Sequence, residues 1–180
     1  GRIDTVVHPF CSGSGDDVRI TTRVDRKDPF NCLYSTIHEV GHACYEQNIS
    51  EEFMHSPLGS GVSLGIHESQ SRIFENQIGR SRQFTKWLFR KMREYFGDFG
   101  IKDEEEFYRL VNRVQTGYIR TEADEVHYNL HIMLSFELEV DVISKNLEVV
   151  DLPAAWNEKF KDYFGKDVKN FSDGILQDVH

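Results

Sequence analysis

The chain has 180 residues, of which 39% are apolar and 28% are charged, and its formal net charge is −9. This composition is ordinary for a globular domain that is long enough to bury a core. The acidic balance argues against a nucleic-acid partner, which would require a basic stripe. No apolar run reaches the length of a membrane span. We therefore expect one domain over residues 1–180, with neither nucleic acid nor membrane as a partner.

The cysteines indicate where the protein is located, and the two ends of the chain indicate that it is part of a longer protein. Three cysteines, Cys11, Cys32 and Cys44, are an odd number without the spacing of a disulfide framework. This favours a reduced, cytoplasmic location. The sequence starts without methionine or an apolar signal segment, and it stops at a histidine inside a pattern. We expect a fragment of a longer protein.

The first third of the chain predicts a strand followed by a helix. Residues 1–16 contain a Gly- and Ser-rich turn and are expected to form a loop. Residues 17–25 alternate apolar and polar side chains, which is typical of a strand with one apolar face. A helix follows, because Asp28 can cap it and Pro29 suits its first position. Its expected core stripe is Leu33, Ile37 and Val40.

The rest of the chain is expected to be helical, after a Gly- and Ser-rich loop over residues 55–65. Apolar residues recur with helical spacing in every later segment. The last helix should bury an aromatic stripe with spacings of four, and the fold class is mainly α with a small β element. The predicted helices cover residues 66–79, 81–96, 103–114, 118–146 and a short segment from 153 that carries Trp156, Phe160 and Phe164.

The segment YSTIHEVGHACYEQ, residues 34–47, contains the pattern H-E-x-x-H. On a helix, His38 and His42 lie one turn apart on the same face, so both can aim a ring nitrogen at one metal ion. Glu39 lies beside them, where it can accept a proton from a metal-activated water. The alternative is a solvated helix face with two unrelated histidines. A third ligand would decide between them, because two histidines leave a catalytic zinc site one ligand short.

The third ligand must come from a separate element that folds back over this helix. The segment HESQSRIFEN, from residue 67, offers Glu68 and its neighbour His67, and the residues alone do not choose between them. Helical spacing places Glu68, Arg72 and Glu75 on one face. Arg72 or Ser71 can orient a carboxylate ligand through hydrogen bonds. The alternative for such residues is an ordinary surface ion pair.

Five ordered motifs give the chain a resemblance to a known family. HEVGHACYEQ followed by HESQSRIFEN resembles the carboxypeptidase Taq family of thermostable metallocarboxypeptidases. Four further segments are similar to motifs of that family, and family members are much longer than this chain. The segments are HPF at 8–10, DVRIT at 17–21, IRTEAD at 119–124 and GILQDVH at 174–180.

The resemblance implies a site, a fold and an activity. The metal ligands would be His38, His42 and Glu68, with Glu39 as general base. From their position on the same helix, Ser71, Arg72 and Glu75 are expected to support the ligands. The ion would be zinc, one per chain, and cobalt also suits two histidines and a glutamate. The implied fold is a zincin-like helical metallopeptidase core with its β element near the active site. The implied activity is removal of single residues from peptide C-termini with broad specificity, often by a homodimer.

A carboxypeptidase must recognise a terminal carboxylate, which a guanidinium binds through two parallel hydrogen bonds. Arg120, at the start of the predicted long helix, is the first choice because the IRTEAD segment matches the family there. Arg19 is second, and its strand can pair with an extended substrate as edge strands do. The other candidate substrate-binding residues lie in the family motifs, and each can instead be purely structural. They are Asp17, Thr21, His8, Gln177 and His180.

Two other functions stay open at this stage. The chain can be a catalytically incompetent helical fragment that retains the metal ligands but lacks the substrate groove. An aminopeptidase is a weaker alternative, because no Glu-rich motif for recognising an amine precedes the H-E-x-x-H pattern.

Overall fold

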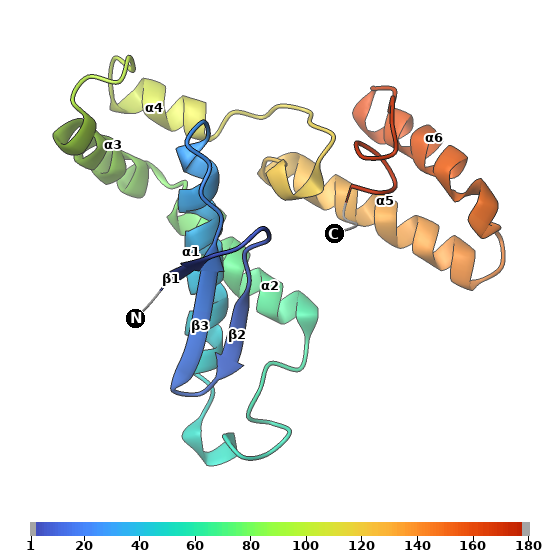
Figure 1. The fold of residues 1–180 in the computed structure, drawn as a ribbon, viewed down its shortest axis with the longest axis horizontal. Coiled ribbons are helices and arrows are strands. Elements are labelled where there is room, and N and C mark those ends of the chain that lie inside the picture. Colours follow the sequence, from blue (N-terminus) through green and yellow to red (C-terminus); the bar gives the residue numbers. More distant parts are fainter. Residues whose placement is uncertain (1–2, 178–180) are drawn as a thin grey trace. The chain divides into compact units, whose positions relative to one another are not determined.

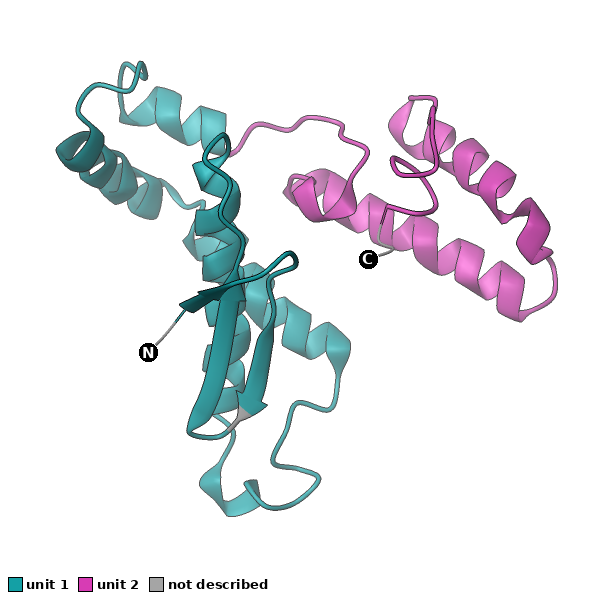
Figure 2. Ribbon diagram, in the orientation of Figure 1, with its two compact units in different colours: residues 1–111 teal, residues 112–180 magenta. Residues whose placement is uncertain are grey.

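A computed structural model describes residues 3–177, and the chain divides into two compact units. The first unit spans residues 1–111 and the second spans residues 112–180 (Figure 2). The first contains the only sheet of the described residues together with helices, and the second is helical (Figure 1). The predicted mainly α class with a small β element is confirmed. The prediction of a single domain over residues 1–180 stays a prediction.

The sheet has three strands, β1 (Ile3–Thr5), β2 (Cys11–Ser14) and β3 (Asp17–Thr22), in the order β1-β3-β2. β1 runs parallel to β3, and β2 runs antiparallel to it. The expectation that residues 1–16 form a loop is therefore wrong. All three residues of β1 are exposed, so no alternation of apolar and polar side chains marks that strand in the sequence.

The predicted strand is shorter than expected and lies in the middle of the sheet. β3 ends at Thr22, whose hydroxyl lies 2.9 Å from the Thr36 hydroxyl of the following helix. Val24, expected on the apolar face, is 62% exposed beyond the strand. Because β1 and β2 flank β3, the expectation that β3 is an edge strand is wrong.

Helix α1 (Pro29–Gln47) runs along the sheet (Figure 1). It begins as predicted, with the Asp28 carboxylate accepting a hydrogen bond from the Asn31 amide at 3.1 Å and proline in the first turn. The expected stripe of Leu33, Ile37 and Val40 is only half-buried. The most buried residues of the helix are instead Tyr34, Glu39, Gly41 and Glu46.

After a short 3-10 turn, η1 (Glu51–Phe53), helix α2 (Leu64–Arg72) packs against α1. The Ser63 hydroxyl caps α2 by accepting a hydrogen bond from the Ile66 amide at 3.3 Å. The predicted helix over 66–79 is not uniform, because α2 continues as the π-helical segment η2 (Ile73–Ile78). The wider π turn changes which side chains face α1 and is common at functional sites.

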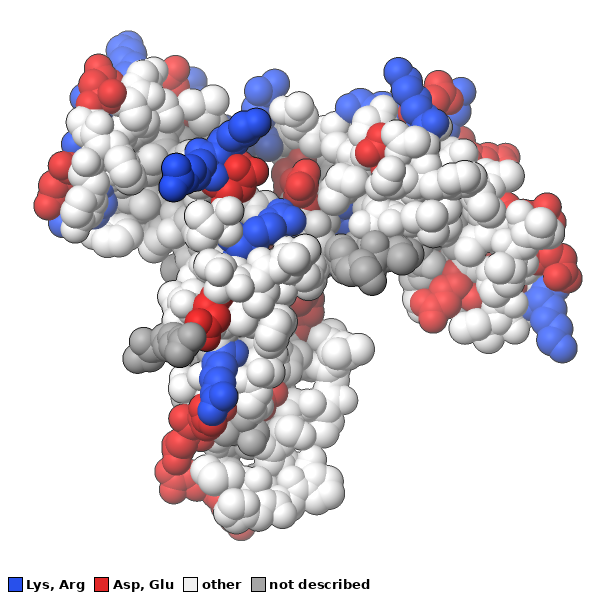
Figure 3. All heavy atoms as spheres, in the orientation of Figure 1, with Lys and Arg blue, Asp and Glu red and all other residues white. Residues whose placement is uncertain are grey.

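Helices α3 (Arg82–Phe96) and α4 (Glu104–Val111) complete the first unit around a core of Leu88, Phe89 and Phe107. Met92 of α3 packs on this core, whereas Tyr95 is exposed. Exposed ion pairs such as Arg90–Glu104, 2.8 Å apart, join the two helices. Acidic and basic side chains are interspersed over this unit on the face drawn in Figure 3. Such surface pairs stabilise little individually.

The second unit pairs α5 (Glu125–Ile143) with α6 (Leu152–Phe164), linked through a 3-10 turn, η4 (Val149–Asp151). The predicted helix over 118–146 is wrong at its start. Residues 120–122 form the 3-10 turn η3 (Arg120–Glu122), and Ala123 is extended. α5 begins later because the Asp124 carboxylate accepts hydrogen bonds from the amides of Val126 and His127.

The predicted aromatic stripe of α6 is confirmed. Trp156, Phe160 and Phe164 pack against Leu134 and Leu138 of α5. Within residues 3–177, no helix has both the length and the apolar content that crossing a membrane demands.

Candidate metal centre

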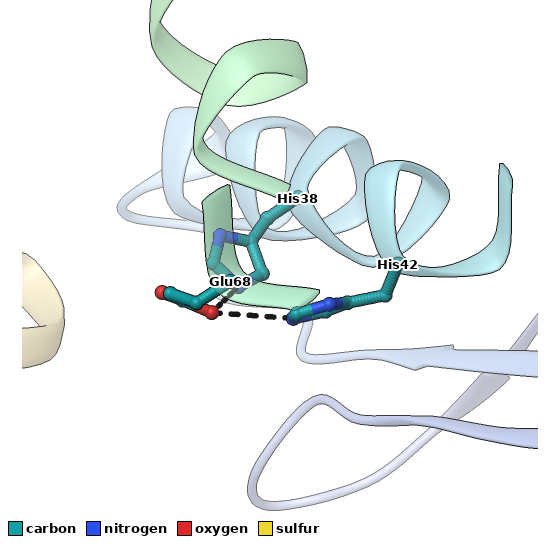
Figure 4. A group of neighbouring side chains, drawn as sticks. All are labelled: His38, His42 and Glu68. Atoms are coloured by element: carbon teal, nitrogen blue, oxygen red, sulfur yellow. Dashed lines mark ion pairs between the residues drawn. The ribbon is translucent and has the colours of Figure 1, made fainter. Parts of the chain in front are cut away.

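Two elements of the first unit bring His38, His42 and Glu68 to one point. His38 and His42 project from successive turns of α1, and Glu68 reaches between them from α2 (Figure 4). The Glu68 Oε2 atom lies 3.5 Å from His38 Nε2 and 3.3 Å from His42 Nε2. One ligand atom from each residue lies within 4.8 Å of the other two. Glu68, and not its neighbour His67, therefore occupies the shared point.

A glycine allows the two helices to approach closely enough for this convergence. A Cβ atom added to Gly41 would lie 2.6 Å from the Ser71 Cα atom and 2.8 Å from the Gln70 carbonyl oxygen. The two backbones are thus in direct contact one residue before His42. Ser71 is fully buried there, and its hydroxyl lies 2.7 Å from the Glu68 carbonyl and 3.1 Å from its carboxylate. Ser71 therefore contacts the Glu68 carboxylate, and its role in orienting a ligand stays a prediction.

The other ring nitrogen of His38 has a carboxylate partner on η2. His38 Nδ1 lies 2.9 Å from Glu75 Oε2, and the Arg72 guanidinium donates to the same oxygen at 2.9 Å. Arg80 lies 3.6 Å from the other Glu75 oxygen. Glu75 is therefore held between cations while it fixes the ring of His38, an arrangement common among metal-binding histidines.

The charges of this group shift its pKa values strongly. Burial alone would lower the pKa of His38, but hydrogen bonds to Glu68 and Glu75 outweigh burial and raise that pKa to about 9. Burial opposes ionisation of Glu68, yet its bonds to His38 and His42 hold the Glu68 pKa well below its ordinary value. The pKa of Glu75 is lowered in the same way, chiefly by His38. The carboxylates of Glu68 and Glu75 are therefore ionised, which suits Glu68 to bind a cation.

Glu39 lies on the buried side of α1, next to His38 and His42. The side chain is only 6% exposed. Its burial raises its pKa, although the neighbouring His38 and His42 pull the pKa down. A carboxylate whose pKa is raised is a stronger base, which suits the predicted role of proton acceptor.

The donor set fits a divalent metal ion. Zinc binds histidine nitrogen and carboxylate oxygen at roughly 2.0–2.2 Å, so the ligand atoms of a tetrahedral site lie about 3.4 Å apart. The two nitrogen-to-oxygen distances to Glu68, 3.3 and 3.5 Å, agree with that spacing. Three protein ligands leave the fourth position for water or substrate, as in catalytic zinc sites.

The structure also connects His42 to His67 and Glu46 through side-chain contacts that the sequence did not predict. His42 Nδ1 lies 2.6 Å from His67 Nδ1, and His67 Nε2 lies 2.7 Å from Glu46 Oε1. Sequence reasoning considered His67 only as a ligand and did not consider Glu46. The one available signal was spacing, since Glu46 follows His42 by four residues and shares its helix face.

The predicted substrate-binding residues of the first unit have varied surroundings. Arg19 and Asp17 form an exposed ion pair at 2.6 Å on β3. Thr21 is buried, and its hydroxyl bonds the backbone of Phe10 at 2.9 and 3.2 Å. His8 is exposed. These contacts give Thr21 a structural role in the sheet.

The remaining predicted residues belong to the second unit. The Arg120 amide donates to Gln177 Oε1 at 2.7 Å, and the Arg120 guanidinium donates to the Tyr128 hydroxyl at 3.0 Å. The structure thus brings Arg120 and Gln177 together. Arg120 lies in the 3-10 turn η3 and not at the start of a long helix. His180 lies outside the described residues.

A family model for carboxypeptidase Taq (M32) metallopeptidases matches residues 1–180. The chain belongs to this family. It is 48% identical to thermostable carboxypeptidase 1 of Thermus thermophilus and 45% identical to carboxypeptidase 1 of Bacillus subtilis. Each match covers 100% of this chain and 36% of the relative. The family predicted from the ordered motifs is confirmed.

Solved structures of M32 enzymes share the fold. The M32 carboxypeptidase of Deinococcus radiodurans aligns with a TM-score of 0.93 at 48% identity, covering 99% of this chain and 36% of that one. Metallocarboxypeptidase 1 of Trypanosoma cruzi aligns with the same TM-score at 44% identity, covering 99% and 37%. The chain thus spans about a third of the length of the M32 proteins that it matches.

Proposed function

We propose that the full-length protein is a metal-dependent carboxypeptidase that hydrolyses the C-terminal peptide bond of peptides with broad specificity. One ion per chain would bind to His38, His42 and Glu68. Zinc is the proposed metal, and cobalt suits the same donor set. By resemblance to its family, the full-length protein is proposed to be a homodimer. The observation that carries the proposal is the convergence of two histidines and a glutamate at one point beside Glu39, in a chain that belongs to the M32 family.

The proposed roles follow from the chemistry of each group. When bound, the metal ion supplies a Lewis acid that polarises the scissile carbonyl and acidifies water. Glu39 accepts the proton of the attacking water and passes it to the departing amine. Glu68 contributes the negative charge of the ligand set, while Ser71 and Glu75 keep Glu68 and His38 oriented.

Metal removal tests the proposal directly. The full-length protein is treated with a chelator, and cleavage of a free-acid peptide is followed before and after Zn²⁺ or Co²⁺ is restored. We expect cleavage to disappear with the metal and to return with about one equivalent of ion per chain, because Glu39 alone cannot activate water sufficiently. Elemental analysis measures the stoichiometry. Full cleavage by the metal-free protein would contradict the proposal.

A second candidate is a fragment that retains the metal ligands without turnover. Its support is the length of the chain, which spans 36% of its relatives while containing all three proposed ligands. The same assays on residues 1–180 alone separate the two. If this chain binds metal but cleaves no peptide, while the full-length protein is active, the substrate groove requires the remainder of the protein.

Arg120 is the proposed partner of the terminal carboxylate of the substrate, with Arg19 second. The support is the family motif around Arg120 and the anchoring of its backbone by Gln177. Arg120→Lys should lower kcat/KM for free-acid peptides by about 10- to 150-fold, equivalent to 1.5–3 kcal/mol for a charged hydrogen bond. Lysine keeps the charge but not the bidentate geometry. Cleavage of C-terminally amidated peptides, already slow, should hardly change.

Arg19→Lys is the matched variant in the first unit. It should leave both substrates nearly unaffected, because Arg19 is exposed and pairs with Asp17. Equal losses on both substrates after Arg120→Lys would assign Arg120 to structure. A loss of cleavage restricted to free-acid peptides after Arg19→Lys would make Arg19 the partner of the terminal carboxylate.

A further inference from the structure

His42, His67 and Glu46 form a continuous chain of side-chain hydrogen bonds. The two Nδ1 atoms of His42 and His67 lie 2.6 Å apart, and His67 Nε2 lies 2.7 Å from Glu46 Oε1. All three side chains are mostly buried, with Glu46 only 11% exposed. His42 therefore differs from His38, whose Nδ1 contacts the Glu75 carboxylate directly.

The chemistry of the three groups fixes the direction of this chain. The Glu46 carboxylate only accepts hydrogen bonds, so a neutral His67 must carry its proton on Nε2. His67 Nδ1 is then an acceptor, and His42 must donate to it from Nδ1–H. That tautomer leaves the lone pair of His42 on Nε2, which is the atom that faces Glu68. The opposite tautomer would place two acceptors 2.7 Å apart at Glu46.

We propose that His67 is a positioning residue which, together with Glu46, holds His42 in the tautomer and ring orientation that present Nε2 to the metal ion. This inference rests on the proposed metal centre and adds residues that neither bind the ion nor touch the substrate. It concerns where protons lie in neutral rings and requires no change of net charge. Histidine ligands in metal sites commonly depend on such a partner at the second ring nitrogen.

The surrounding packing keeps the chain of hydrogen bonds in register. Gly61 lies over it, because an added Cβ there would lie 2.7 Å from His67 and 3.2 Å from Glu46 Oε1. The Gly61 amide also points to that oxygen at 3.4 Å. The Tyr45 ring meets the His67 ring edge-on at a centroid distance of 5.0 Å. His67 is thus confined by Gly61 and by Tyr45, as a positioning residue must be.

Substitutions of equal size at position 67 separate positioning from space filling. His67→Leu removes both polar atoms, whereas His67→Asn keeps an acceptor where Nδ1 was. We expect the Co²⁺ affinity of the full-length protein, measured by chelator competition, to fall about 10- to 100-fold in His67→Leu. His67→Asn should recover a large part of that loss, and the visible spectrum of bound Co²⁺ should change most in the leucine variant.

Glu46→Gln tests whether Glu46 acts through His67. Alone it should weaken Co²⁺ binding by several-fold, since an amide orients His67 less strictly than a carboxylate. Added to His67→Asn it should have no further effect, because the connection is already broken. His55, exposed in the loop after η1, provides control leucine and asparagine variants that should bind Co²⁺ normally. Thermal unfolding of each metal-free variant verifies folding, and Glu46→Gln carries the test if His67→Leu does not fold.

Each outcome decides one proposal. Equal losses in His67→Leu and His67→Asn would make His67 a space-filling residue, and an affinity within twofold of wild type in His67→Leu would also overturn its positioning role. Additive losses of Co²⁺ affinity from the substitutions at positions 46 and 67 would mean that Glu46 does not act through His67. Failure of the wild-type protein to bind Co²⁺ would instead refute the metal centre itself.

Discussion

Replacing Glu39 by glutamine is expected to lower kcat for peptide hydrolysis by about 10²- to 10⁴-fold, the usual contribution of a general base. Glutamine has the same shape as glutamate but cannot accept a proton. Glu39 is not among the three converging ligands, so Zn²⁺ and Co²⁺ affinities should remain within a few-fold of wild type. Steady-state kinetics and chelator competition on the full-length protein measure the two quantities.

Glu94→Gln is the matched control, because Glu94 is an exposed carboxylate of α3 that pairs only weakly with Lys91 across the surface. It should change neither rate nor metal binding. Hydrolysis by Glu39→Gln within tenfold of wild type would place the general base elsewhere. A parallel loss of metal would mean that Glu39 supports the ligand set rather than the proton transfer.

The spacing of the H-E-x-x-H pattern predicted the local geometry because a helix has a fixed period. His38 and His42 had to share a face once residues 34–47 were helical, and the Asp28 cap and Pro29 made that helix predictable. The convergence of Glu68 was not fixed by periodicity. It required the resemblance to the family, since a loop of more than ten residues permits many return paths.

The features that could not be predicted depend on contacts between distant segments. Gly41 is a packing site only because the Ser71 backbone lies against it. Glu75 reaches His38 from a π-helical turn that helical periodicity does not indicate. β1 is exposed throughout and exists only through parallel pairing with β3. In each case the decisive interaction joins residues separated by more than ten positions, so no local pattern records it.

The two ligand histidines are supported in different ways, and this difference affects what each substitution measures. His38 is bonded to Glu75, whose charge is balanced by Arg72 and Arg80. His42 is bonded to the ring of His67. A substitution in the first set changes the charge near the ion, whereas one at His67 changes only orientation. Metal affinity and the Co²⁺ spectrum together distinguish these effects.

Glu68→Gln is expected to weaken Zn²⁺ and Co²⁺ binding by more than about 100-fold, because a lost ligand exceeds the 10- to 100-fold effect of a supporting residue. The amide retains the shape of the side chain and its hydrogen bond from Ser71, so the two helices should stay packed. Hydrolysis should fall with metal occupancy. Chelator competition on the full-length protein gives the affinity. The control is Glu105→Gln, because Glu105 is an exposed carboxylate of α4 paired with Arg109.

His67 was the alternative third ligand in the sequence, and the ranking of variants decides between the two residues. A greater loss in His67→Asn than in Glu68→Gln would make His67 the ligand, whereas the distances to His38 and His42 predict the opposite order.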